Sequence, residues 1–273
     1  MFRRSPQWKR FRGPLLAGTA IYLAVAAFAP LAARSMIYFP QYGSHREPEG
    51  LVKIRAADGN DVTVLHLPNP SADFTIWFFH GNAEDLGDVE PMLRALRDSG
   101  FAVFAHDYPG YGSSTGRPSE RSLYASAREA RRYLRETLGV SADRTLLLGR
   151  SLGGGPAVQM ATEERMGGLV LQSTFVSAFR VVTRWPLLPF DQFKNLAKIR
   201  RIGCPLLVMH GQADEVIPLW HGEKLFAKAR DPKRQLWVAG ARHNDFTAVA
   251  GRTYFETLRD FSVVCAAERR LRP

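Results

Sequence analysis

The stretch LLLGRSLGGGPAVQM, from Leu146 to Met160, places one serine among four glycines. The apolar run before the serine is typical of a buried strand, and the segment after it has helical character. In a nucleophile elbow the order is strand, Gly-x-Ser-x-Gly, helix, and the flanking glycines permit a sharp turn that exposes the serine hydroxyl. A plain tight turn is the alternative. We therefore predict that Ser151 is a nucleophile at the start of a helix.

A serine nucleophile needs a base, and the base needs an acid that orients it. In chains with this elbow, the acid and then the histidine follow the serine, each on a loop after a later strand. His243, in VAGARHNDF after the sixth predicted buried strand, is the predicted base. Asp214, in HGQADEVIP directly after the fifth, is the predicted acid. Glu215 is the close alternative, and Asp245 is a weaker one.

The oxyanion formed during such a reaction needs two hydrogen-bond donors. The backbone N–H of Leu152, which follows the nucleophile, is the first predicted donor. The backbone N–H of Asn82 is the second, because FFHGNAED places it just after the first buried strand. A plain turn that ends the strand is the alternative interpretation of this loop.

Apolar runs alternate with helical spacing along most of the chain. Residues 51–68 indicate a hairpin, and buried strands are predicted at 74–80, 101–106, 144–149, 167–173, 204–211 and 234–240. Helices are predicted at about 89–98, 121–138 and 246–264, and another follows the Ser151 stretch and ends at about residue 164. This alternation predicts an α/β fold whose parallel strands are joined by crossover helices.

Residues 175–201 interrupt the alternation with Trp185-Pro186 and Pro189-Phe190. We predict a short lid over a pocket here, with an ordinary long loop as the alternative.

The first 34 residues form a predicted segment of their own. MFRRSPQWKRFRG carries five Lys or Arg residues and no acid, and residues 15–33 then contain no charge. Such a run approaches the roughly 20 residues that cross a bilayer. We predict a single-pass anchor with a cytoplasmic N-terminus and the folded domain, residues 35–273, on the far side, which is periplasmic in a bacterium. A cleaved signal peptide is the main alternative.

Composition excludes several function classes. The net charge of +11 is concentrated at the two ends of the chain, which favours contact with anionic lipid over nucleic acid. Cys204 and Cys265 are the only cysteines, and neither lies near histidines at zinc-ligand spacing, so we predict no metal site. DYPGYGSSTGRPS and the Gly153–Gly155 run lack the spacing of nucleotide-binding loops, so we predict no cofactor.

HGN, DYPGYGSS, GRSLGG, HGQADEVIP and ARHND together resemble the α/β-hydrolase superfamily in kind and order. HGNAEDLG, DYPGYGSSTGRPSERSLY and PFDQFKNLAKIRRIGCPLLVMHGQADEVIP more closely resemble the membrane-anchored serine hydrolases grouped with the α/β-hydrolase-domain depalmitoylases. The resemblance implies an eight-stranded, mostly parallel sheet and a triad of Ser151, Asp214 and His243 that works without a cofactor. Arg150, beside the predicted nucleophile, differs from the residue that the depalmitoylases of that group carry at this position.

These patterns predict a serine hydrolase that cleaves an ester or thioester of a small or acylated substrate through an acyl-enzyme. A peptidase of the same fold, or a membrane-anchored binding protein without turnover, is the alternative. For Arg150, the alternatives are a salt bridge directed away from the site and a role in binding an acidic substrate or leaving group.

Overall fold

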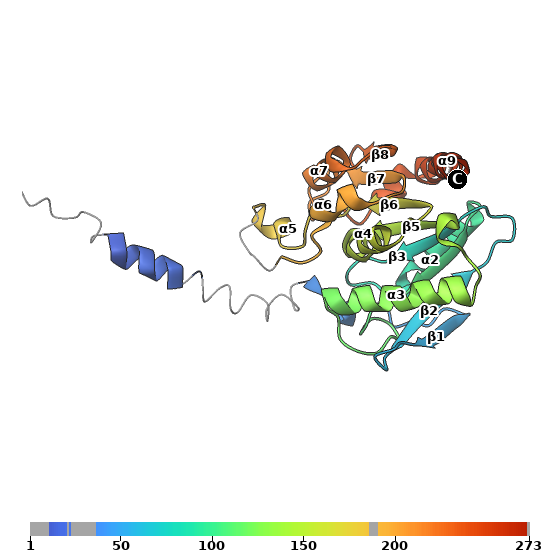
Figure 1. The fold of residues 1–273 in the computed structure, drawn as a ribbon, viewed down its shortest axis with the longest axis horizontal. Helices are drawn as coiled ribbons and strands as arrows, with labels where there is room; N and C mark the ends of the chain where they lie inside the picture. Colours follow the sequence, from blue (N-terminus) through green and yellow to red (C-terminus); the bar gives the residue numbers. More distant parts are fainter. Residues whose placement is uncertain (1–10, 21, 23–36, 186–190, 272–273) are drawn as a thin grey trace, which may run out of the picture.

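A computed structural model describes residues 11–20, 22, 37–185 and 191–271 of the protein. Its strands form one eight-stranded sheet in the order β1-β2-β4-β3-β5-β6-β7-β8 (Figure 1). The strands are β1 (Leu51–Arg55), β2 (Asp61–Leu67), β3 (Thr75–Phe79), β4 (Ala102–His106), β5 (Thr145–Arg150), β6 (Gly168–Gln172), β7 (Leu206–Gly211) and β8 (Lys233–Val238). The helices are α2 (Leu86–Asp98), α3 (Glu120–Glu136), α4 (Gly154–Glu163), α5 (Arg180–Thr183), α6 (Asn195–Lys198), α7 (Trp220–Lys228), α8 (Phe246–Ala250) and α9 (Arg252–Arg270). Short 3₁₀ turns are η1 (Pro40–Tyr42), η2 (Ala142–Arg144), η3 (Ser151–Gly153) and η4 (Ile199–Arg201).

The sheet is mostly parallel, which confirms the predicted fold class. Strands β3 to β8 pair in parallel, whereas β1 pairs with β2, and β2 with β4, in antiparallel register. Parallel strands need long crossovers, and the helices between them supply these. Because the carboxyl ends of parallel strands meet at one edge, the loops after β3, β5 and β7 lie close together.

Helices cover both faces of the sheet, so its central strands are buried on both sides. Alternate residues of β3 enter different cores: Trp77 and Phe79 pack with α3 and α4, and Ile76 and Phe78 pack with α2 and α9. This explains why the strand sequences are continuously apolar rather than alternating.

The last predicted helix is divided in the structure. The prediction of one helix over 246–264 is wrong in this respect, because α8 ends at Ala250 and α9 begins at Arg252. Gly251 between them has φ +53 and ψ −129, a non-helical backbone conformation that glycine adopts at little cost and other residues rarely adopt.

The predicted membrane segment lies partly outside the described residues. Residues 11–20 are helical, whereas residues 23–36 are not described. Within the described ranges, no helix has the length and apolar character needed to cross a membrane.

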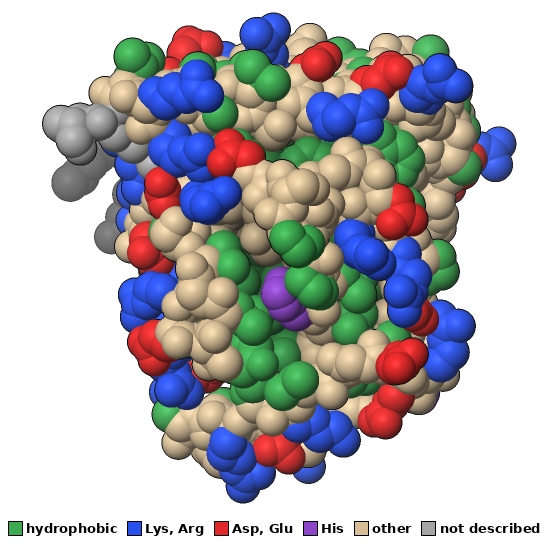
Figure 2. All heavy atoms as spheres, turned by 90° about the vertical axis from the view of Figure 1, so that its right-hand side faces the viewer, with side chains coloured by type: hydrophobic (Ala, Val, Ile, Leu, Met, Phe, Trp, Pro, Cys, Tyr) green, Lys and Arg blue, Asp and Glu red, His purple; other side chains and the backbone are tan. Residues whose placement is uncertain are grey.

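Charged side chains are mixed over the surface that Figure 2 presents, where Lys and Arg lie among Asp and Glu rather than in one basic patch. Among the described residues, paired groups include Arg128 with Glu163 and Arg269 with Asp73.

Candidate active site

The turn after β5 holds Ser151 in a strained conformation. Its φ is +51, in the left-handed region that residues with a side chain rarely adopt. A Cβ atom at Gly153 would lie 2.1 Å from the Phe79 carbonyl oxygen, and one at Gly149 would lie 2.6 Å from the Gly153 carbonyl oxygen. Both glycines are therefore required by close backbone packing. The Thr174 hydroxyl also donates to the Ser151 carbonyl oxygen at 2.7 Å.

The structure brings Ser151, His243 and Asp214 together. His243 Nε2 lies 3.0 Å from Ser151 Oγ, and His243 Nδ1 lies 2.8 Å from Asp214 Oδ2. The three residues come from loops after β5, β8 and β7, as the sequence predicted. Since Asp214 Oδ2 accepts a hydrogen bond, Nδ1 carries the proton and Nε2 is free to accept one from the serine.

Asp214 is buried and held by several donors. Its Oδ1 accepts from the Val216 and Ile217 amides at 3.0 and 2.7 Å. His210 Nε2 lies 2.7 Å from the Ile217 carbonyl oxygen and 3.3 Å from Asp214 Oδ2, so its N–H faces both. Burial acts to raise the pKa of Asp214, but the hydrogen bonds from His210 and His243 outweigh it and hold the pKa well below its usual range. The carboxylate is thus charged at neutral pH.

The two alternative acids lie elsewhere. Glu215 is exposed. Asp245 Oδ1 accepts from the Arg242 amide at 2.6 Å, so this carboxylate closes its own loop.

The loop after β3 carries Asn82, one of the two predicted oxyanion donors. Its side-chain Oδ1 accepts from Tyr111 OH at 2.7 Å and from the Phe39 amide at 2.9 Å. Its backbone N–H donates to no residue that the structure describes. Asn82 and Leu152 both line a cavity that also contains Ser151. The two residues that carry the predicted donors therefore border the same cavity as Ser151.

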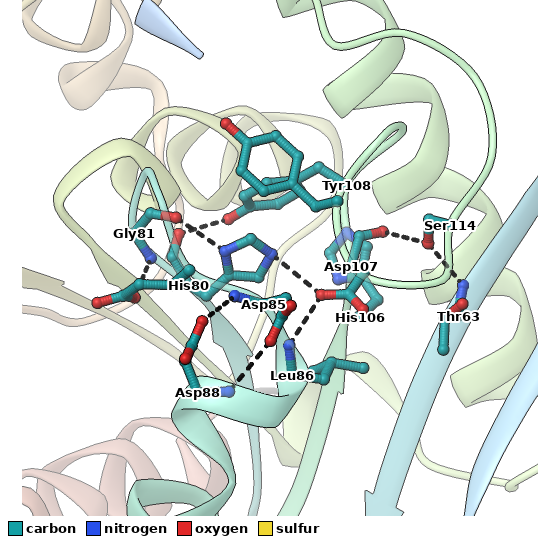
Figure 3. Close-up of polar contacts among 12 residues, drawn as sticks. Thr63, His80, Gly81, Asp85, Leu86, Asp88, His106, Asp107, Tyr108 and Ser114 are labelled. Atoms are coloured by element: carbon teal, nitrogen blue, oxygen red, sulfur yellow. Dashed lines mark hydrogen bonds and ion pairs between the residues drawn. The ribbon is translucent and has the colours of Figure 1, made fainter. Parts of the chain in front are cut away.

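A buried polar cluster supports this loop from behind. Figure 3 shows the His80 ring between the Gly81 carbonyl oxygen, 2.8 Å from Nδ1, and the Asp107 carboxyl group, 3.5 Å from Nε2. Tyr108 OH donates to the His80 carbonyl oxygen at 2.8 Å, and Asp107 Oδ1 accepts from the Leu86 amide at 2.9 Å. Burial lowers the pKa of His80 to about 4 and raises that of Asp107 to about 8.

Sequence reasoning missed this cluster. The sequence excludes DYPGYGSSTGRPS as a nucleotide-binding loop, but nothing in its composition indicates that Asp107 is buried. The charge of an aspartate directly after a buried strand was the only available signal.

Two cavities meet at Ser151, and Asn82, Phe39 and Val216 also border both. The larger, of about 450 Å³, contains polar groups: Glu84, Arg150, Gln172, His243, Asn244 and Thr247. The smaller, of about 210 Å³, is mainly apolar: its wall includes Ile37, Phe175, Ala178, Phe179, Val181 and Val182. Part of the predicted lid segment, residues 175–182, thus forms one wall of the apolar cavity.

Arg150 lies in the polar cavity and forms an ion pair with Glu84. Of the two alternatives for Arg150, a salt bridge is present, but the pair borders the site rather than pointing away from it. No group of three or more His, Cys, Asp or Glu side chains in the described part of the chain is arranged to hold a metal ion.

The fold is that of the α/β hydrolases. The family model described as the α/β hydrolase fold matches residues 75–191. An esterase from Pyrococcus furiosus is similar with a TM-score of 0.64 and 18% identity, over 77% of this chain and 90% of that one. A monoacylglycerol lipase from Paleococcus ferrophilus is similar with a TM-score of 0.60 and 20% identity, over 75% of this chain and 99% of that one.

Relatives similar in sequence identify the group within this family to which the chain belongs. The human α/β hydrolase domain-containing protein 17B is 35% identical over 81% of this chain and 78% of its own length. The Caenorhabditis elegans α/β hydrolase domain-containing protein aho-3 is 41% identical over 71% of this chain, and the match spans 59% of that relative. The chain belongs to the α/β hydrolase family, in the group of the α/β hydrolase domain-containing proteins 17.

Proposed function

We propose that this α/β hydrolase is a serine hydrolase that cleaves an ester or thioester through an acyl-enzyme. The observation that carries the proposal is the continuous hydrogen-bond chain from Ser151 through His243 to Asp214. These distances are within the range at which a base can take the proton of a nucleophile.

In the proposed first step, Ser151 Oγ attacks the acyl carbon while His243 Nε2 takes the hydroxyl proton. Asp214 stabilises the imidazolium that forms. The Leu152 and Asn82 amides bind the oxyanion. The tetrahedral intermediate then expels the alcohol or thiol, which receives the proton from His243. Water attacks the acyl-enzyme in the same manner and releases the acid.

The two cavities support an orientation for the substrate. An acyl chain is best placed in the apolar cavity beside Val181 and Val182, because its burial there removes apolar surface from water. The leaving group is then best placed in the polar cavity beside His243, which must protonate it.

A fluorophosphonate probe tests the proposal, since it forms a bond only with an activated serine. We expect stoichiometric labelling and hydrolysis of p-nitrophenyl esters by the intact protein, and loss of both in Ser151→Ala. His243→Gln should lower kcat by about 10⁴-fold or more. Folded protein that is neither labelled nor active would overturn the proposal and favour a binding protein without turnover. Hydrolysis of peptides in preference to esters would favour a peptidase.

We further propose that the N-terminal segment holds this enzyme at a membrane. Support comes from the basic flank and the uncharged run at residues 15–33, whose length and order are typical of an anchor. The hydrolase domain would then lie on the side of the membrane opposite to the basic flank.

A further inference from the structure

Glu84 joins the loop after β3 to the turn after β5. One carboxylate oxygen, Oε2, accepts from the Gly81 amide at 2.9 Å. The other, Oε1, pairs with the guanidinium of Arg150, the residue that directly precedes Ser151. One side chain therefore contacts both the segment that carries Asn82 and the segment that carries the serine.

These contacts fix the peptide group whose N–H belongs to Asn82. That group consists of the Gly81 carbonyl and the Asn82 amide and is planar. His80 Nδ1 donates to the Gly81 carbonyl oxygen at 2.8 Å, while Glu84 holds the Gly81 amide on the other side of the same residue. With both polar groups of Gly81 held, the direction of the Asn82 N–H is set before any substrate binds.

The positive charge of Arg150 stabilises the ionised carboxylate of Glu84 in its half-buried position. The side chains of Arg150 and Glu84 are only 23% and 27% exposed. Burial acts to raise the pKa of Glu84, but the charge and hydrogen bond of Arg150, together with smaller contributions from His80 and the Gly81 amide, outweigh it and leave the pKa lowered. The guanidinium is also fixed from a second side, since it lies 5.7 Å from the Phe78 ring centroid. An unpaired carboxylate here would disfavour a developing oxyanion nearby.

We propose that Arg150 and Glu84 form a positioning pair that aligns the Asn82 N–H with Ser151. This inference rests on the proposed function and adds two residues that act through the Asn82 loop without touching the reacting atoms. The role differs from binding an acidic substrate, because the charge of Arg150 is already satisfied within the protein.

Single and double substitutions test the pair. Glu84→Gln places an amide NH₂ opposite either the guanidinium or the Gly81 N–H, and Arg150→Gln leaves the carboxylate without a cation. We expect each to lower kcat by about 10- to 100-fold with KM changed less than about threefold, as for a misplaced oxyanion donor. In Glu84→Gln/Arg150→Gln the introduced amides can bond to each other while one oxygen still accepts from Gly81. We expect this variant to recover to within about fivefold of wild-type kcat.

The affinity of a trifluoromethyl ketone, whose oxygen occupies the oxyanion site, provides a second readout. The affinity for this inhibitor should weaken in parallel with kcat/KM in the two single variants and recover in the double variant. Arg128→Gln, which removes a comparable pair with Glu163 between α3 and α4, is the matched control and should leave kcat and inhibitor affinity unchanged.

Four outcomes are informative. Wild-type kcat and inhibitor affinity in both single variants would overturn the positioning pair while leaving the serine hydrolase intact. Additive losses in the double variant would overturn it too. If KM for acidic esters rises in Arg150→Gln while kcat is retained, the pair is instead a substrate-binding group. Failure of the proposed function is recognised separately, because the wild-type protein would then resist the fluorophosphonate and show no Ser151-dependent turnover.

Discussion

Ser151, the proposed nucleophile, shows how local backbone packing enforces a strained conformation. A residue with a side chain in the left-handed region costs of order 1–3 kcal/mol, so the surroundings must enforce it. They do so through the close contacts of Gly149 and Gly153 with neighbouring backbone and through the hydrogen bond from Thr174. The free energy that strains the serine is thus supplied by the packing of β3, β5 and α4.

Gly153→Ala should be strongly destabilising. Its Cβ would lie 2.1 Å from the Phe79 carbonyl oxygen, and backbone cannot rotate aside as a side chain can. We expect a loss of about 3 kcal/mol or more, which lowers Tm by roughly 6–12 °C in a domain of this size. Differential scanning calorimetry measures the change.

Gly203→Ala is the control, because its Cβ would meet only the flexible Arg165 side chain, at 3.6 Å. This variant should keep the wild-type Tm. Equal melting temperatures for Gly153→Ala and Gly203→Ala would contradict the packing argument.

The order of the chain was sufficient to predict Ser151, Asp214 and His243 as neighbours, because each follows a parallel strand whose end is fixed by the sheet. It was not sufficient for Glu84 or Asp107. Their partners, Arg150 and His80, depend on how two loops pack against each other, and a loop has no periodicity that reveals its burial. The sequence leaves the role of Arg150 open, and the packing of the two loops makes Glu84 its partner.

Asp107 should make stability depend on pH. Burial raises its pKa from 3.8 to about 8, so the folded protein retains a proton that the unfolded chain releases between these values. This contribution to stability is complete below about pH 4 and is lost as the pH rises towards 8. The Asp107→Asn variant has no carboxyl group at this position that could gain or lose a proton. Its free energy of unfolding relative to wild type should therefore increase over this window, by at most about 1.4 kcal/mol per pH unit.

Urea unfolding of both proteins at pH 5 and pH 8 measures this difference. The buried His80 and His106 have lowered pKa values and act in the opposite direction, weakening the fold as the pH falls below about 6.5. They are common to both proteins and largely cancel in the comparison. A pH-independent difference would show that Asp107 is ionised in the fold.

At the scale of elements, the segment between β6 and β7 is the part of the fold for which sequence periodicity predicts no secondary structure. It contains the short helices α5 and α6, each of four residues, too short for a helical pattern to be recognised. Its described residues nevertheless form the wall of the apolar cavity. A lid function for this segment stays a prediction.

Ala178→Phe should shorten the acyl chain that the enzyme accepts. Ala178 lines the apolar cavity of about 210 Å³, so a larger side chain there removes space from the acyl group. We expect kcat/KM for p-nitrophenyl octanoate to fall by about tenfold or more, and kcat/KM for the acetate ester to change less than about threefold.

Val263→Phe is the control, since Val263 is 68% exposed on α9 and does not line the cavity. It should leave both esters unaffected. An equal fall for acetate and octanoate in Ala178→Phe would place the acyl chain elsewhere.

At the scale of the whole molecule, the positive charge at the two ends contrasts with the mixed charges on the face in Figure 2. The basic N-terminal flank, rather than this face, is therefore the part of the chain where we propose contact with anionic lipid.

Removing residues 1–34 should release the protein from membranes. We expect the full chain to float with phosphatidylglycerol-containing vesicles in a density gradient even in 1 M NaCl, because an inserted apolar run is insensitive to salt. Residues 35–273 should stay at the bottom of the gradient. Flotation of the full chain that is abolished by salt would indicate surface attachment, and equal flotation of both proteins would contradict a role for the segment.

The meeting of two cavities at one serine has a kinetic consequence. In the orientation proposed above, with the acyl chain in the apolar cavity and the leaving group in the polar one, the first product would depart without disturbing the bound acyl group. The space that it vacates admits water directly to the acyl carbon beside His243. Release is then ordered, with the alcohol or thiol first and the acid last, so the free acid competes with the substrate for the resting enzyme.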